Sequence, residues 1–431
     1  MNHLPEIEVQ SPDAVKRFQE EKLTATVRYL AQYSPFYQRL FSEHGVVAEN
    51  ITSLDDLATL PVTTKDDFQN HNWDFLCVAR ERIAEYTSTS GTLGSPVIVA
   101  LTENDLQRLA YNESISFACA DGSSADLYQL MLTLDRQFMA GIAYYQGIHK
   151  LGAGLIRVGP GLPAMQWETI QRLKPTVLVG VPSFLVKLIE YAEQNGIDLN
   201  QCSVKKAVCI GESLRTADLS LNALSQKIAD AWNIKLYGTY ASTEMQTAFT
   251  ECGEGKGGHH HPELIIVEVL NDNNQPVKPG EVGEVTITTL GVEAMPLLRY
   301  KTGDMATAHT EACACGRTTL RLGPIVGRKQ QMIKLKGTTL YPPGIFEILN
   351  QVPGVDDYAV EVVTGELGTD ELNLHILTKP EQQPKTQEHL RAAFQSRLRV
   401  VPSIVFTTQP VLEKLQHAGR KIKKFIDSRK K

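Results

Sequence analysis

The sequence predicts an α/β protein with two domains. The large N-terminal domain has mainly parallel sheets flanked by helices plus a β-rich subdomain, and the C-terminal domain is small and α+β. Three observations predict this class. Short apolar runs alternate with helical patterns over 101–238, strands joined by Asn, Asp, Gly and Pro turns occupy 264–300, and a further set of strands with one helix ends the chain. We therefore place the domains at 1–327 and 328–431.

The composition is that of a globular protein, with 431 residues, 42% of them hydrophobic and 21% charged. A formal net charge of −6 argues against bulk nucleic-acid binding. No apolar run approaches the length of a membrane span, and the first residues lack the regions of a signal peptide. Seven scattered cysteines fit reduced thiols or a metal site better than a disulfide framework. We expect a cytoplasmic protein.

The first elements in the chain are helical. Residues 11–44 carry helical periodicity that Pro35 interrupts, so two helices are expected there. Strand–helix units then follow, with strands expected at 127–132, 154–158, 175–180, 206–211 and 234–237 and helices at 167–173, 185–192 and 219–232. Because ligands of such sheets bind at the carboxyl ends of the strands, the turns 180–183 and 211–213 are candidate site loops.

The last third of the chain is read as two groups of strands. Strands are expected at 264–270, 283–289 and 297–300, and in the small domain at 358–363, 372–377 and 403–407 with a helix at 386–398. The small domain is thus about 100 residues long, which is enough to fold around a core of its own.

Residues 87–96 (TSTSGTLGSP) form a loop suited to a polyphosphate, and an apolar strand at 97–101 follows. Four hydroxyl residues in a row offer no side chain for packing, and two glycines let backbone amides approach a ligand closely. Hydroxyls and amides are the donors that phosphate oxygens need. The loop is not the P-loop of the common NTPases, since no Lys-Ser or Lys-Thr follows Gly94. An ordinary polar turn between strands is the alternative.

Four further features follow in order along the chain. Glu244 puts a carboxylate beside hydroxyl residues after a strand, and Asp304 puts an acceptor-only carboxylate, suited to a ribose diol, in a turn. Arg328 opens the small domain. Residues 419–421 (GRK) lie in a loop near the C-terminus that offers an ammonium group. Each feature alone is more often surface structure, but the ordered set indicates a function.

This ordered set resembles the adenylate-forming superfamily of acyl-CoA synthetases, luciferases and peptide-synthetase adenylation domains, and within it the phenylacetate–CoA ligases. The matching segments are 34–37 (SPFY), 54–57 (LDDL), 60–65 (LPVTTK), 90–92 (SGT), 299–304 (RYKTGD) and 313–318 (CACGRT). The resemblance covers about residues 15–427. It implies that a carboxylate attacks the α-phosphate of ATP and that coenzyme A then displaces AMP, with the small domain as a mobile lid.

The resemblance also implies roles for individual residues. The resemblance implies that the 88–94 loop binds the departing phosphates through Ser88, Thr89, Ser90, Gly91, Thr92 and Gly94. Glu244 helps to hold Mg²⁺, Thr243 lies by the α-phosphate, Asp304 takes the ribose hydroxyls, and Arg328 also reaches the nucleotide. The remaining nucleotide-binding residues are Gly211, Glu212, Ser213, Tyr240, Ala241 and Ser242.

Three departures from the family pattern concern the same site. Ser95 stands where the family often has Lys, and Gln330 stands at the hinge position, which is usually charged. The C-terminal Gly-Lys becomes Gly-Arg-Lys. Counting back from Asp427 selects Lys421 as the catalytic lysine, whereas counting forward from Gly419 selects Arg420. We favour Lys421.

Phe138, Tyr144 and Tyr145 lie in the segment that lines the acyl pocket in this family. An aromatic wall suits an aryl or arylacetic acid. The alternative is that these aromatic side chains fill a gap in the core.

A separate cluster of Cys252, His259, Cys313 and Cys315 has the ligands of a structural zinc site. Glycines between Cys252 and His259 let the chain wrap, and His260 or His261 could replace His259. With all four positions filled by protein, the metal would pin the 245–262 loop to the 305–318 loop. The alternative is two unrelated cysteine-bearing turns.

We therefore expect an acid–CoA ligase that uses ATP, Mg²⁺ and coenzyme A, with a structural Zn²⁺ and, by family analogy, a homodimer. The alternatives are an adenylyltransferase with an acceptor other than coenzyme A and a nucleotide-binding relative with weak or no catalysis. A nucleic-acid binder is opposed by the acidic net charge.

Overall fold

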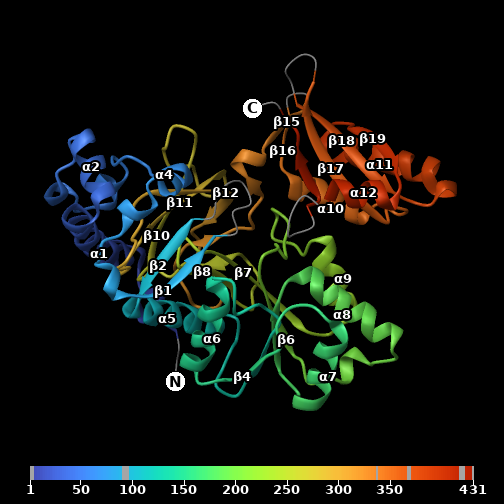
Figure 1. Ribbon diagram of the computed structural model, residues 1–431, viewed down its shortest axis with the longest axis horizontal. Coiled ribbons are helices and arrows are strands. Elements are labelled where there is room, and N and C mark those ends of the chain that lie inside the picture. Colours follow the sequence, from blue (N-terminus) through green and yellow to red (C-terminus); the bar gives the residue numbers. More distant parts are fainter. Residues whose placement is uncertain (1–3, 90–96, 336–337, 366–369, 417–422, 430–431) are drawn as a thin grey trace. The chain divides into compact units, whose positions relative to one another are not determined.

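A computed structural model describes residues 4–89, 97–335, 338–365, 370–416 and 423–429 (Figure 1). The chain divides into two compact units, Met1–Pro324 and Ile325–Lys431. The α/β class predicted from the sequence is confirmed in the first unit, and the second unit is α+β. That the second unit acts as a mobile lid remains a prediction.

The first unit begins with helices and continues with alternating strands and helices. Its helices are α1 (Pro12–Tyr33), α2 (Pro35–His44), α3 (Leu54–Leu57), α4 (Lys65–Asn70), α5 (Glu103–Cys119), α6 (Met139–Leu151), α7 (Pro163–Leu173), α8 (Pro182–Gln194) and α9 (Ala223–Ala231). Its strands are β1 (Ile83–Ser88), β2 (Ile98–Thr102), β3 (Leu127–Leu130), β4 (Gly154–Arg157), β5 (Val177–Gly180), β6 (Lys206–Cys209), β7 (Lys235–Ser242), β8 (Thr247–Glu251), β9 (Gly258–His259), β10 (Ile265–Leu270), β11 (Val282–Thr289), β12 (Tyr300–His309) and β13 (Arg321–Leu322). Ser34 ends α1 and caps α2 by accepting a hydrogen bond from Tyr37 N, so the break expected at Pro35 is present.

One sheet runs through the first unit in the order β10-β11-β12-β13-β9-β8-β7-β6-β5-β3-β4. The pairs from β4 to β7 are parallel, and those from β7 to β10 are antiparallel. The parallel strands and the β-rich subdomain expected from the sequence are therefore two halves of one sheet. β1 and β2 form a separate antiparallel pair.

Alternating side chains bury both faces of the parallel half. Leu178 of β5 packs with α7, α8 and α9, whereas its neighbours Val177 and Val179 pack with α5 and α6. This two-sided burial explains why the parallel strands read as continuous apolar runs in the sequence.

The antiparallel half of the sheet is narrow at one place. The two-residue strands β9 and β13 pair with each other and connect β8 to β12. Few backbone hydrogen bonds therefore join β8 to β12 through these two short strands, and the cysteine and histidine cluster lies here.

α6 (Met139–Leu151) is not among the helices expected from the sequence. Gly147 lets α6 approach α5 closely, because a Cβ at this position would lie 2.2 Å from Glu113 Cβ. The low helix propensity of glycine is overridden here by tertiary packing.

The second unit packs strands and helices around its own hydrophobic core. Its elements are β14 (Gly327–Arg328), β15 (Ile333–Leu335), β16 (Thr338–Leu340), α10 (Pro342–Gln351), β17 (Asp357–Thr364), β18 (Asp370–Leu377), α11 (Gln383–Leu398), β19 (Ser403–Thr407), α12 (Gln409–Gln416) and β20 (Phe425–Asp427). Its four-stranded sheet has the order β19-β18-β17-β20. A search of the described helices of both units for a membrane-spanning segment finds none.

Candidate active site

The carboxyl ends of the parallel strands bring the predicted site loops to one edge of the sheet. Glu212, in the turn after β6, accepts hydrogen bonds from Ser183 N at 2.9 Å and from Ser183 Oγ at 2.8 Å at the start of α8. A carboxylate at a helix N-terminus satisfies a free backbone N–H and interacts favourably with the helix dipole. The Glu212 side chain thus fixes the spacing between the turns after β5 and β6. Ser213 is held within its own loop, because its Oγ donates to Arg215 O at 2.9 Å.

Tyr240 and Asp304, which are far apart in the sequence, meet in the structure. Tyr240 Oη, on β7, donates a hydrogen bond to Asp304 Oδ2, on β12, at 2.8 Å. The Tyr240 ring stacks on Phe249 with centroids 6.0 Å apart. Burial and the neighbouring Asp304 carboxylate raise the pKa of Tyr240 well above its usual value. Tyr240 is therefore a neutral donor that orients the Asp304 carboxylate.

A bulge in β12 places Asp304. Lys301 pairs with Thr286 and Met305 with Glu284, so β12 uses more residues than β11 over the same length. Gly303 takes a φ of +79° at this point, a conformation that favours glycine. The bulge interrupts the ladder and turns the adjacent carboxylate out of the regular strand pattern.

Thr243 and Glu244 lie in the turn between β7 and β8, a few residues beyond Tyr240. Ser242 Oγ accepts a hydrogen bond from Met245 N at 3.3 Å and stabilises this turn, and Ala241 is exposed just before it. The negative charge of Glu244 is one of the causes that raise the pKa of Tyr240. Glu244 and Asp304 therefore both place negative charge around the same tyrosine.

The loop predicted to bind phosphates joins β1 to β2, and only its start lies among the described residues. Thr89 Oγ1 accepts a hydrogen bond from Val97 N at 3.0 Å, and Ser88 Oγ donates to Thr89 O at 3.2 Å. The other predicted phosphate-binding residues, Ser90, Gly91, Thr92 and Gly94, and the substituted Ser95 lie outside the described residues.

The predicted basic residues belong to the second unit. Arg328 is exposed in β14. Lys421 and Arg420 lie outside the described residues. Lys424, three positions after Lys421, pairs with Asp357 at 3.0 Å and lies 4.1 Å from the centre of the Tyr358 ring. Lys424 is thus already used in the packing of β20.

The three predicted acyl-pocket residues have different environments. Tyr144 is buried in the core beneath α5, in edge contact with Phe117, and Phe138 is 37% exposed at the start of α6. Tyr145 lies on the adjacent face of α6, where the Arg157 guanidinium stands 5.6 Å from its ring centre. Tyr144 thus also makes the core packing that the sequence analysis kept as the alternative, and the acyl-pocket role of the three residues remains a prediction.

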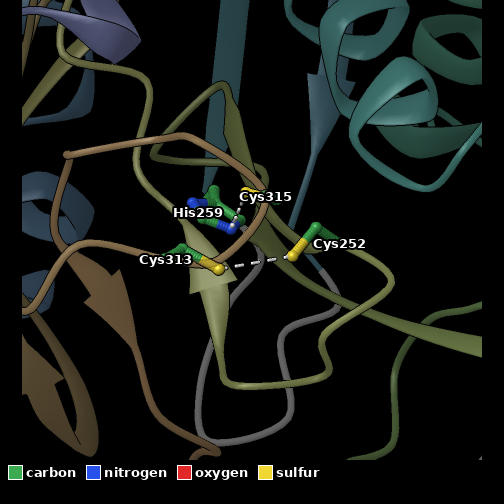
Figure 2. A group of neighbouring side chains, drawn as sticks. All are labelled: Cys252, His259, Cys313 and Cys315. Carbon is green, nitrogen blue, oxygen red and sulfur yellow. Dashed lines mark hydrogen bonds between the residues drawn. The ribbon is translucent and has the colours of Figure 1, made fainter.

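The cysteine and histidine cluster assembles around the short strand β9 (Figure 2). Cys252 directly follows β8, His259 lies in β9, and Cys313 and Cys315 lie in the loop between β12 and β13. The four ligand atoms lie within 4.8 Å of one another. Cys252 Sγ is 3.7 Å from Cys313 Sγ, and Cys315 Sγ is 3.5 Å from His259 Nε2.

The Cys252–Cys313 and Cys315–His259 distances match those expected around a tetrahedral zinc ion. Zn–S bonds of about 2.3 Å and Zn–N bonds of about 2.0 Å at tetrahedral angles place two sulfurs about 3.8 Å apart and a sulfur and a nitrogen about 3.5 Å apart. Burial lowers the pKa of His259 to about 3, so its imidazole is neutral, as a metal ligand must be. The set of three sulfurs and one imidazole nitrogen is one that zinc prefers.

The sequence analysis did not single out an ion pair that connects this cluster to the site loops. Arg215 Nε, after the 211–213 turn, donates to Glu251 Oε1 at 2.7 Å, and Glu251 Oε2 accepts from Gly238 N at 3.2 Å. Glu251 directly precedes Cys252. No local sequence signal marks this pair, because its partners are 36 residues apart.

Comparison with known proteins agrees with this arrangement. A family model described as AMP-binding enzyme matches residues 35–294. The phenylacetate-coenzyme A ligase of Thermus thermophilus is 32% identical, over 87% of this chain and 84% of that protein, and that of Escherichia coli is 29% identical, over 80% and 78%. The structure of 2-hydroxyisobutyryl-CoA ligase with 2-HIB-AMP in the postadenylation state matches with a TM-score of 0.84 and 22% identity, over 98% of this chain and 92% of that chain, and shows the same fold.

Proposed function

Because this chain belongs to the AMP-binding enzyme family and to its phenylacetate–coenzyme A ligase branch, we propose that it joins an aryl or arylacetic carboxylate to coenzyme A at the expense of ATP. A carboxylate oxygen attacks the α-phosphorus of ATP and expels pyrophosphate, which gives an acyl-adenylate. The coenzyme A sulfur then attacks the acyl carbon, its proton is lost, and AMP leaves with the electrons of the C–O bond.

The observation that carries this proposal is the meeting of Asp304, Tyr240 and the β7–β8 turn at the carboxyl edge of the parallel strands. Asp304 offers acceptor atoms to the two ribose hydroxyls, and the hydrogen bond from Tyr240 orients that carboxylate. Thr243 and Glu244 lie in the β7–β8 turn, shortly after Tyr240 in the chain. In the proposed complex the α-phosphate, which follows the ribose in ATP, would lie next to this turn. Mg²⁺ bound there would neutralise phosphate charge, and the Glu244 carboxylate is the kind of ligand that it takes.

The remaining assignments of nucleotide contacts follow from the family relationship. Because the Glu212 carboxylate is bound to Ser183, we assign the adenine contact of this turn to the backbone of 211–213. Lys421 is assigned the positive charge that adenylation needs between the α-phosphate and the departing pyrophosphate, where Lys acts as a point charge.

The choice of an aromatic acid is supported by Phe138 and Tyr145. The side chains of these two residues are not buried in the core, so they can contact an aromatic substrate. Carboxylate-dependent exchange of pyrophosphate into ATP tests this choice with phenylacetate, benzoate, acetate and 2-hydroxyisobutyrate. We expect exchange to be fastest with an aryl acid. Exchange with the aliphatic acids alone would contradict the aryl assignment, and no exchange with any carboxylate would contradict the adenylation itself.

The acceptor is tested separately from the acid. If coenzyme A is the acceptor, AMP release in the presence of the preferred acid will increase in proportion to added coenzyme A, with one thioester formed per AMP. Adenylate that accumulates and does not react with coenzyme A would favour the alternative, an adenylyltransferase with another acceptor.

We also propose one structural zinc ion per chain at Cys252, His259, Cys313 and Cys315. Its role would be to hold β8 and β9 to the β12–β13 loop, so that Asp304 on β12 keeps its distance from Tyr240 on β7. Elemental analysis of protein purified without metal-affinity resin tests the site, and less than about a tenth of an equivalent of zinc in reducing buffer would contradict it. A homodimer and a cytoplasmic location remain predictions.

A further inference from the structure

Glu8 is a buried carboxylate that no step of the proposed reaction uses. It lies in the 3-10 turn η1 (Glu6–Val9), and of the four residues of this turn, all of which the structure describes, Glu8 alone is buried. Its side chain is 0% exposed. A turn that served only to cover the core would bury an apolar residue, because burying a charge without partners is costly. The position therefore calls for a specific partner.

Glu8 has two such partners, and both follow residues of the zinc cluster in the chain. Its Oε1 is 2.5 Å from His261 Nδ1, and its Oε2 accepts from Arg317 Nε at 2.6 Å. His261 and Arg317 are themselves buried, at 0% and 6% exposure. His261 Nε2 is in turn 3.2 Å from Ser116 Oγ, on α5.

Arg317 connects Glu8 to a cluster sulfur. While its Nε donates to Glu8, its Nη1 donates to Cys315 Sγ at 3.6 Å. The two contacts use different nitrogens of one rigid, planar guanidinium group, so the direction of one constrains the other. The backbone adds to this connection, since Thr318 N donates to Glu8 O at 2.8 Å.

We propose that Glu8 is a positioning residue of the metal centre: it holds the Arg317 guanidinium, which in turn holds the Cys315 sulfur in place as a ligand. Three thiolates and one imidazole give Zn²⁺ one net negative charge, which the guanidinium offsets in a buried site. The η1 turn is thus an outer part of the metal centre, although the ligands, Cys252 to Cys315, lie about 240 to 310 residues further along the chain than Glu8. This inference rests on the zinc site proposed above.

Zinc affinity in folded protein tests the inference. Wild type, Glu8→Gln, Arg317→Lys and the double variant are stripped of metal, and zinc is titrated against a chromophoric chelator. Glu6→Gln, a change in an exposed residue of the same turn, is the matched control. We expect Glu8→Gln and Arg317→Lys each to weaken zinc binding about 10- to 100-fold, and Glu6→Gln to leave it unchanged. The Arg317→Lys variant should bind zinc more weakly because a single ammonium group cannot reproduce the simultaneous contacts of the guanidinium group with Glu8 and with Cys315.

The double variant separates a positioning role from a merely structural one. If Glu8 acts through Arg317, the double variant will bind zinc about as weakly as the weaker single variant. A lower melting temperature of Glu8→Gln with unchanged zinc affinity would show that Glu8 only anchors the turn, and would overturn the inference. If Glu8→Gln does not fold, the zinc titration uses two other variants instead. These are Glu8→Asp, which keeps the negative charge, and Arg317→Lys.

The same titration distinguishes the inference from the site on which it rests. Wild-type protein that binds no zinc would overturn both. Wild-type protein that binds zinc, with a Glu8→Gln variant of equal affinity, would overturn only the role of Glu8.

Discussion

Replacing Asp304 by Ala tests the proposed nucleotide site directly. The change removes the carboxylate that accepts from Tyr240 Oη at 2.8 Å and, in the proposed complex, from both ribose hydroxyls. Hydroxyl groups left without an acceptor in a site shielded from water cost about 1–3 kcal/mol. We therefore expect the dissociation constant of ATP to rise about 5- to 150-fold.

The assay is a calorimetric titration with ATP in the absence of a carboxylate, so that no turnover occurs. Pyrophosphate exchange and thioester formation from supplied acyl-adenylate are measured on the same variant, and both should slow, because both states contain the ribose. Tyr240→Phe is a matched change, since it removes the hydroxyl that orients the carboxylate but keeps the carboxylate itself. Its effect on ATP affinity should be smaller than that of Asp304→Ala.

Two results would refute this reasoning. Unchanged ATP affinity in an Asp304→Ala variant that melts at the wild-type temperature would move the ribose site elsewhere. A larger loss in Tyr240→Phe than in Asp304→Ala would show that the Tyr240 hydroxyl, and not the Asp304 carboxylate, makes the main contact with the ribose. Asp55→Ala, a change in a side chain that is 90% exposed, controls for unspecific effects.

Three further predictions concern the lid lysine and the packing of α5 on α6. Lys421→Ala should slow adenylation by orders of magnitude yet spare thioester formation from supplied acyl-adenylate; an equal loss in both half-reactions would contradict this, and Arg420→Ala tests the other register. Burial raises the pKa of Glu113 to about 8 from 4.5, so the folded state holds a proton that the unfolded state has lost, and the free energy of unfolding should fall between about pH 4.5 and pH 8. Glu113→Gln should remove this decrease, up to about 5 kcal/mol, in urea unfolding at pH 5 and pH 8, and identical pH dependence in both proteins would count against it. Gly147→Ala should lower the free energy of unfolding by about 1–3 kcal/mol, because the new methyl group meets Glu113 Cβ at 2.2 Å, whereas Gly344→Ala, where no atom lies within 4 Å, should not.

Much of the fold is predictable from local patterns. Apolar runs bounded by glycine and proline place β5 and β6 to within two residues, and Pro35 separates α1 from α2, because burial on both faces and the geometry of proline act within a few residues. β9 and β13 are not predictable in this way. Each has two residues, and each is a strand because of the neighbours with which it pairs.

The same division applies to the site. Residue types and their order indicated Asp304, Glu244 and the cysteine and histidine cluster, since carboxylates, thiolates and imidazoles have recognisable chemistry wherever they lie. The contact from Tyr240 to Asp304, the commitment of Glu212 to Ser183 and the burial of Glu8 against Arg317 depend on tertiary structure. Their partners lie between 29 and 309 residues apart, and no local pattern records which distant side chain will satisfy a given buried polar group. That pairing is decided only when the chain folds into its tertiary structure, because each charge that becomes buried then needs a partner.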